Sequence, residues 1–147
     1  MSADFSTLIG RFIHHCGALE LLTNNSIRAF ATDPLLATDA IKSSLYNRIK
    51  LLRQLLHDSS GINKNDIDSL CDELDEIRKK RNIVAHNPIL SKNPNDTNTG
   101  EILVFRYKPA EITSSYKLTK EDVAKLVEQT RKLLITFADL IPESTNA

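Results

Sequence analysis

Residues 64–86 read KNDIDSLCDELDEIRKKRNIVAH, and this stretch decides the fold. The steps from Leu70 to Leu74, to Ile77, to position 81 and to Val84 alternate between four and three residues. This spacing places all five positions on one face of a helix. Arg81 occupies the one position of the five where a helix bundle would be expected to carry an apolar side chain. The stretch therefore predicts an amphipathic helix whose buried stripe contains a charged residue.

Three more segments show helical spacing of apolar residues. They run from about 6 to 30, from Thr38–Asp39 to Gly61, and from Thr119 to Pro142. The helix quoted above is therefore third in order; it opens after Asn63 or Asn65 and ends at Asn87–Pro88. Thr119 and Asp122 resemble a capping box for the last helix. Residues 91–100 read as an exposed loop, Ile102–Tyr107 and Ile112–Leu118 as a strand hairpin, and the last five residues as a frayed tail. We therefore predict an all-α four-helix bundle with a small β-hairpin before the last helix, forming a single domain over residues 1–147.

The composition is that of an ordinary globular domain, with 147 residues, 41% hydrophobic and 26% charged. Nineteen basic residues balance nineteen acidic ones, so any surface that binds a polyanion must be a local patch. Neither a signal peptide nor a membrane-spanning run is visible, and Cys16 and Cys71 do not suggest a disulfide framework. We expect a cytoplasmic protein that does not contact a membrane.

A buried arginine is costly unless it is paired, so we expect Arg81 to meet a partner across the bundle. Glu20 and Asn24 share a face of the first helix with Cys16 and are candidates, although the same face could also be a partly exposed edge. Arg78, Asn82 and His86 follow one another at steps of four, so Asn82 could hydrogen-bond the His86 imidazole.

A simpler interpretation of residues 64–86 also stands. Six acidic residues precede four basic ones, which is the order that the helix dipole favours for a solvated helix end. Lys79 and Lys80 could touch RNA phosphates or belong to an ordinary solvated surface. His14, His15 and Cys16 are consecutive and point in three directions on a helix, so we expect no metal site and no cofactor.

Residues 81–86, RNIVAH, resemble the signature of HEPN domains, in which an arginine with a polar neighbour precedes a histidine by four to six residues. Their place at the end of the third helix of a predicted four-helix bundle agrees with that family. The resemblance implies a metal-independent endoribonuclease of the toxin or phage-defence kind. It further implies a homodimer that acts on RNA, leaves 2′,3′-cyclic phosphate ends and can have an antitoxin or regulatory protein as partner. Arg81, Asn82 and His86 would then be catalytic, with Arg78, Lys79 and Lys80 binding substrate and Glu20 and Asn24 in support.

Two further observations bear on this resemblance. Family toxins that are silenced by AMP transfer carry a tyrosine two residues after the histidine, whereas Pro88 stands at that position here. Arg81 and His86 differ by about 140° around a continuous helix, so a composite site between two copies would bring them together more readily than one chain. The alternatives are a HEPN-like module that serves dimerisation or protein binding without catalysis, and an unrelated helical adaptor.

Overall fold

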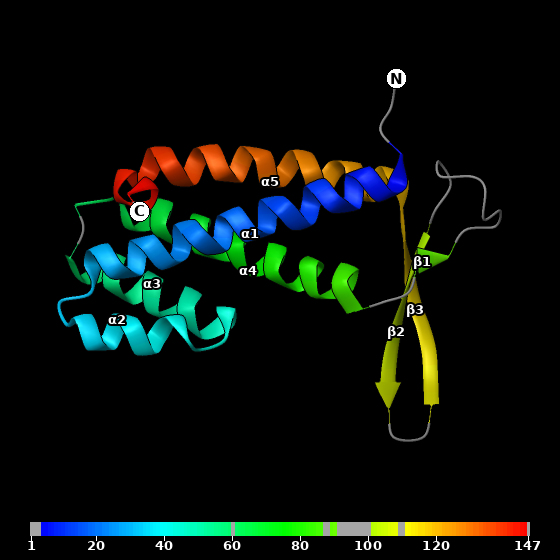
Figure 1. Cartoon of the computed structure of the whole chain (residues 1–147), viewed down its shortest axis with the longest axis horizontal. Helices are drawn as coiled ribbons and strands as arrows, with labels where there is room; N and C mark the ends of the chain where they lie inside the picture. The colour runs from blue at the N-terminus through cyan, green and yellow to red at the C-terminus, as the bar shows by residue number, and fades with distance from the viewer. Residues whose placement is uncertain (1–3, 60, 87–88, 91–100, 109–110, 147) are drawn as a thin grey trace.

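A computed structural model describes residues 4–59, 61–86, 89–90, 101–108 and 111–146. In this part of the chain the elements are, in order, α1 (Phe5–Phe30), α2 (Pro34–Ile41), α3 (Leu45–Ser59), α4 (Lys64–His86), β1 (Ile89–Leu90), β2 (Glu101–Lys108), β3 (Glu111–Thr119), α5 (Lys120–Leu140) and the 3₁₀ turn η1 (Pro142–Thr145). The long helices α1, α3, α4 and α5 lie side by side, and the hairpin extends from one end of them (Figure 1). The helical class expected from the sequence is thus confirmed.

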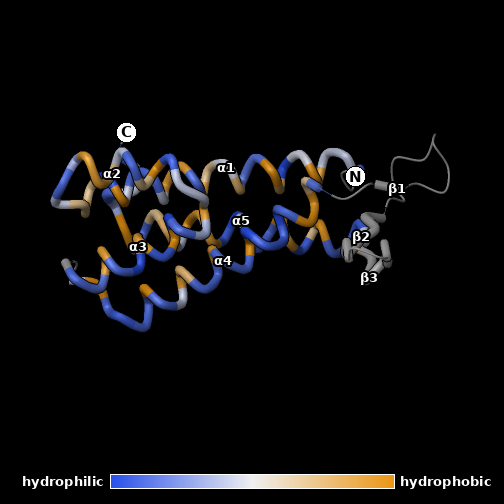
Figure 2. Tube along the Cα trace, turned by 90° about the horizontal axis from the view of Figure 1, so that it is seen from below, coloured by the Kyte–Doolittle hydropathy of each residue, from blue (hydrophilic) through white to orange (hydrophobic). Residues whose placement is uncertain are grey.

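The core forms because each long helix turns one apolar stripe inward. Leu70, Leu74, Ile77 and Val84 of α4 are all buried, as their spacing predicts. Figure 2 shows the hydrophobic residues alternating with hydrophilic ones along the helices. The largest side chains that are fully buried come from the four long helices or their ends: Phe12, Ile27, Leu52, Leu56, Ile67, Leu133, Phe137 and Ile141.

The second predicted helix is wrong in its start, because two helices occupy that region. Asp33 accepts a hydrogen bond from the Leu35 backbone N–H, and Pro34 stands in the first turn, so α2 begins four residues before the expected cap at Thr38. The helix then ends after Ile41, and Ser44 accepts a hydrogen bond from the Asn47 backbone N–H to start α3. Local caps at both starts therefore override the continuous apolar spacing.

Strands β2 and β3 cover the two stretches that the sequence predicts as strands, and they pair antiparallel from Glu101–Thr119 to Lys108–Glu111. A register shift interrupts the pairing between Val104 and Phe105, and β1 adds a two-residue edge beside β2. Strand β3 leads directly into α5, whose first turn has the expected capping box of Thr119 and Asp122. The loop predicted at 91–100 and the helix stop predicted at Asn87–Pro88 lie outside the described residues.

Part of the tail predicted to be frayed is ordered instead, because Pro142–Thr145 form η1. Ser144 in η1 is fully buried, and its carbonyl oxygen accepts a hydrogen bond of 2.9 Å from the Asn25 side chain of α1. This contact holds the chain end against the far end of the bundle from the hairpin (Figure 1). None of the helices in the described ranges has the length and apolar character needed to cross a bilayer.

Candidate functional site

The motif residues occupy the C-terminal turns of α4, and their side chains are exposed. Arg81, Asn82 and His86 are all solvent-accessible, although Ile77 and Val84 on either side of Arg81 in the stripe are buried. The prediction that Arg81 is at least partly buried is wrong. An arginine stem can follow an apolar surface while its guanidinium reaches water, so the stripe is interrupted without burying a charge.

The expected contact of Glu20 and Asn24 with Arg81 is also wrong, because both residues bind Arg48 of α3. The Arg48 guanidinium donates to Glu20 Oε1 at 2.6 Å and to Asn24 Oδ1 at 2.8 Å. Only 7% of Arg48 is exposed, so this is the buried arginine of the bundle. The sequence offered the same signal for it as for Arg81, because Arg48 lies three residues after Leu45 and four before Leu52, on the apolar face of its helix.

A cavity of about 150 Å³ lies between α1, α3 and α4, directly beside Arg81. We call it the Arg81 cavity. Gly17 of α1 and Arg81 of α4 both line it and are both exposed, so they stand at its mouth, whereas Leu74 and Ile77 are buried along its wall. The remaining residues around it are mostly apolar, with a few polar groups: Ile13, Cys16, Leu19, Glu20, Thr23, Leu45, Ile49 and Arg78.

Two helical stripes are interrupted beside the Arg81 cavity, one at Gly17 and one at Arg81. Gly17 follows Ile13 by four residues and precedes Glu20 by three, which is the spacing of the α1 face that lines the cavity. A Cβ atom added to Gly17 would meet nothing within 4 Å, so the missing side chain leaves open space. On α4, Arg81 stands where an apolar side chain would have filled the same space.

Burial keeps the cysteine of this cavity in its thiol form. It raises the pKa of Cys16 to about 12, even though the nearby Arg81 guanidinium opposes the shift. A thiol with so high a pKa is a poor nucleophile at neutral pH. Cys71 is buried and its pKa is similarly raised to about 11. Neither cysteine therefore suits nucleophilic catalysis.

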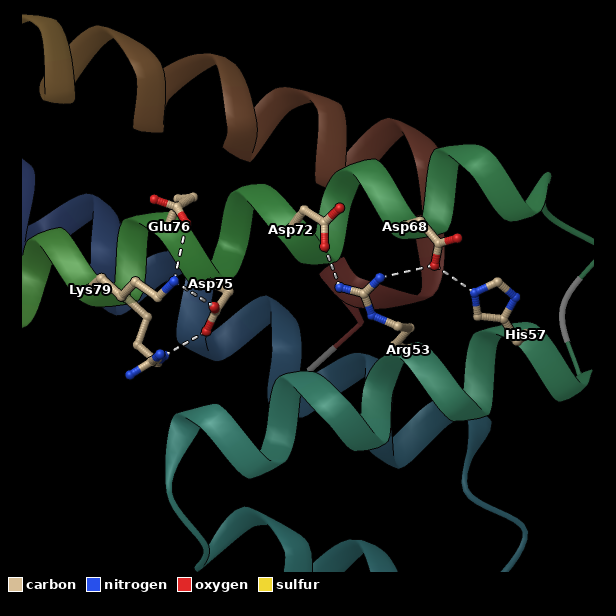
Figure 3. Close-up of polar contacts among 8 residues, drawn as sticks. Arg53, His57, Asp68, Asp72, Asp75, Glu76 and Lys79 are labelled. Atoms are coloured by element: carbon tan, nitrogen blue, oxygen red, sulfur yellow. Dashed lines mark hydrogen bonds and ion pairs between the residues drawn. The ribbon is translucent and has the colours of Figure 1, made fainter.

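Of the three residues predicted to bind substrate beside the motif, two share the Asp75 carboxylate and the third faces another helix. Arg78 donates to Asp75 at 2.8 Å, and its guanidinium lies 5.1 Å from the centre of the Tyr46 ring. Lys79 pairs with Asp75 and Glu76 of its own helix at 3.4 and 3.2 Å (Figure 3). Lys80 faces α5 instead, where its charge helps to lower the pKa of Asp122. Lys79 thus pairs within α4, whereas Arg78 is largely buried beside Tyr46 of α3 and lines the Arg81 cavity.

A second polar network crosses from α3 to α4 farther from the motif. Arg53 donates to Asp68 at 3.0 Å and to Asp72 at 2.6 Å, and His57 Nε2 lies 2.8 Å from Asp68 (Figure 3). The hydrogen bond from His57 and the one from Arg53 lower the pKa of the Asp68 carboxyl. These contacts tie Asp68 and Asp72 of α4 to α3.

Helix α4 continues without a break to His86. Arg81 and His86 are therefore separated by about 140° around the helix and roughly 7.5 Å along it. Within the described residues, Arg81 has no ion-pair partner. The hydrogen bond from Asn82 to His86 that their spacing suggested is not found among these residues. One chain alone therefore does not bring the arginine and the histidine to the same phosphate.

The other histidines serve structural contacts. His15 Nδ1 lies 2.8 Å from Thr130 Oγ1 between α1 and α5, and the ring of His14 is 6.5 Å from that of His15. In the described ranges, no group of three histidine, cysteine, aspartate or glutamate side chains is arranged to hold a metal ion.

Comparison with known proteins leaves this site to be judged from its own geometry: no family model, no curated protein and no solved structure matches the chain.

Proposed function

We propose that this protein is an endoribonuclease of the HEPN type whose active site is completed by a second copy of the chain. The observation that carries the proposal is Arg81, an exposed guanidinium without an ion-pair partner among the described residues, at a position of the stripe that would otherwise be apolar. Five residues later, His86 is exposed at the end of the same helix. An arginine available for a phosphate and an accessible imidazole are the two groups that RNA transesterification requires.

The second copy follows from the geometry of α4. Because the helix is continuous through His86, Arg81 and His86 point to different sides of one chain. A two-fold axis near the end of α4 would set Arg81 of one copy opposite His86 of the other, and the symmetry would form this pair twice. The homodimer thereby creates a site that the single chain lacks.

The chemistry uses a proton transfer and an anion clamp. His86 takes the proton from a ribose 2′-hydroxyl, whose oxygen forms a bond to the adjacent phosphorus. The bond from phosphorus to the 5′-oxygen breaks, and that oxygen is protonated by an imidazolium or by water. Arg81 holds the phosphate and stabilises its equatorial oxygens, while Asn82 contacts the substrate beside them. The products are a 2′,3′-cyclic phosphate and a 5′-hydroxyl, and no step calls for a metal ion.

A second candidate is a non-catalytic module of the same kind that binds a protein. It is favoured by the exposed leucines of α2, where Leu35 is 74% and Leu36 is 46% accessible. Apolar side chains exposed together on a short helix are typical of a surface that a partner covers. In this case an antitoxin or regulatory protein is the partner to be sought at α2.

A cleavage assay distinguishes the two candidates. Purified protein in EDTA is incubated with a mixed RNA substrate, and the product ends are identified by mass spectrometry. Wild type should leave 2′,3′-cyclic phosphates, whereas Arg81→Ala and His86→Ala should lose most of the cleavage. Arg11→Ala and His14→Ala are matched controls, because they remove the same exposed side-chain types from α1. Equal cleavage by wild type and His86→Ala, or activity only after magnesium is added, would contradict the proposed nuclease.

A further inference from the structure

We propose that the Arg81 cavity binds one pyrimidine base of an RNA strand whose adjacent phosphate is held by Arg81. This inference rests on the proposed nuclease function and adds a substrate preference to it. The argument concerns the size of the cavity, the nature of its wall and the polar groups at its rim.

The size of the cavity selects a single ring. Its volume of about 150 Å³ matches that of an apolar cavity able to hold one benzene molecule. A cytosine or uracil ring is of that size, whereas the two fused rings of a purine require more room. The cavity therefore favours a pyrimidine over adenine or guanine.

The wall of the cavity suits the faces of a base. Leu19, Leu74 and Ile77 are buried along it, and Gly17 leaves its mouth without a side chain. Single-stranded RNA is commonly recognised by inserting an unstacked base between side chains that cover its flat faces. A glycine in the middle of α1 costs helix stability relative to alanine, yet here it keeps open the entrance that a base would need.

Polar groups at the rim match the polar edge of the base and the phosphate. Glu20 Oε1 accepts from Arg48, while Glu20 Oε2 accepts no hydrogen bond in the described part of the chain, and the side chain is 39% exposed. A carboxylate oxygen accepts from the cytosine amino group or from the uracil ring N–H. The Arg81 guanidinium stands at the same mouth and suits the phosphate, because it donates to two phosphate oxygens at once.

The first test measures binding of a single nucleotide. Cytidine 3′-monophosphate and adenosine 3′-monophosphate are titrated separately into the wild-type protein, and dissociation constants are taken from calorimetry. We expect the cytidine nucleotide to bind more tightly. Gly17→Leu should fill the cavity and raise the dissociation constant of the cytidine nucleotide about tenfold or more.

Gly10→Leu is the matched control, because Gly10 lies on the same helix, has open space at its Cβ position and does not line the cavity. It should bind the cytidine nucleotide as wild type does. Circular dichroism checks that each variant is folded, and Gly17→Ala, which adds one methyl group, should weaken binding to a smaller degree. Equal binding of the two nucleotides, or cytidine nucleotide binding that neither Gly17 variant weakens, overturns the proposed pocket.

The second test separates the pocket from the nuclease. Sequencing of the 5′-hydroxyl ends produced from a random RNA pool should show a pyrimidine preference in wild type and Gly10→Leu that Gly17→Leu loses. If RNA is cut with the same base preference by wild type and Gly17→Leu, the nuclease stands and the pocket fails. If RNA is not cut but Gly17→Leu still weakens cytidine 3′-monophosphate binding, the pocket stands and the nuclease fails.

Discussion

The guanidinium of Arg48 lies 2.6 Å from the Glu20 carboxylate, and this pair joins α3 to α1 across the bundle. The side chain of Arg48 is 9% exposed and that of Glu20 is 39% exposed, so the ion pair is buried on one side and reaches solvent on the other. Glu20 Oε1 is held by Arg48, while Arg81 stands at the mouth of the cavity without a carboxylate partner in the described residues. One structural pair thus determines which arginine is available for a ligand.

Arg48→Ala should destabilise the protein by about 2–4 kcal/mol, because it removes a buried side chain and leaves Glu20 and Asn24 without their donor. Urea unfolding followed by circular dichroism measures the change. Arg131→Ala is the control: Arg131 pairs with Glu128 on the surface of α5, where both side chains are 51% exposed, and its loss should leave the unfolding midpoint unchanged. An unchanged midpoint for Arg48→Ala would show that the pair does not hold the helices together.

Mixing two inactive variants should restore RNA cleavage if the site is composite. In a dimer of one Arg81→Ala chain and one His86→Ala chain, one of the two sites keeps both an intact arginine and an intact histidine. Random assortment makes half of the dimers mixed, so activity should return to about a quarter of wild type. A site within one chain predicts no recovery, and a protein that remains monomeric in light scattering with RNA present would exclude the composite model.

Both motif variants should fold normally, because Arg81 and His86 are exposed. His86→Ala should lower the rate of RNA cleavage by about 10²–10⁴, the usual effect of losing a general acid or base. Arg81→Ala should reduce cleavage as well, with Arg81→Lys recovering only part of it since lysine lacks the planar fork that binds two phosphate oxygens. Melting temperatures measured beside the cleavage rates check the assignment, and a large drop for Arg81→Ala would indicate a structural role.

The capping box of α5 should make stability depend on pH. The Thr119 backbone N–H donates to Asp122 at 2.9 Å, and this bond lowers the pKa of Asp122 below its ordinary value of 3.8. A carboxyl whose pKa is lowered in the folded state stabilises the protein at pH values above the pKa that it has in the unfolded chain. This contribution is lost as the pH falls through the lowered pKa of the folded state. Asp122→Asn should therefore melt below wild type at pH 7, with a smaller difference at pH 2.5.

Glu121→Gln is the control for this experiment, because it removes a carboxylate from the same first turn outside the capping box. Its melting temperature should differ less from wild type at pH 7 than that of Asp122→Asn. If Asp122→Asn and wild type differ equally at pH 7 and pH 2.5, the cap does not act through the ionised carboxylate.

Replacing Gly17 or Gly10 by alanine should stabilise the protein, because a Cβ at either position meets nothing within 4 Å. The gain should be up to about 1 kcal/mol at each site, the difference in helix propensity between glycine and alanine. Thermal melting of the two single variants measures it. A loss of stability at Gly17 alone would mean that the cavity does not have room for the added methyl group.

The sequence by itself determined α1, α4 and α5, because the apolar spacing of each recurs over many turns, whereas the single helix predicted from Thr38 to Gly61 is two helices. It also identified the capping box of Thr119 and Asp122, whose two hydrogen bonds depend only on residues three apart. The hairpin strands were likewise visible as two short β-prone stretches before α5. These features are local, so the residues that create them are neighbours in the chain.

The tertiary structure decided which arginine is buried. Arg48 and Arg81 each stand on an apolar helical face, and only the packing of α3 against α1 gives Glu20 and Asn24 to Arg48. The same packing sets Gly17 opposite the stripe of α4 and so opens the cavity beside Arg81. Contacts of this kind depend on the distance between helices and on the rotation of each helix about its axis. The spacing of apolar residues within one helix does not specify either quantity. The exposure of His86, by contrast, follows from its place at the end of α4.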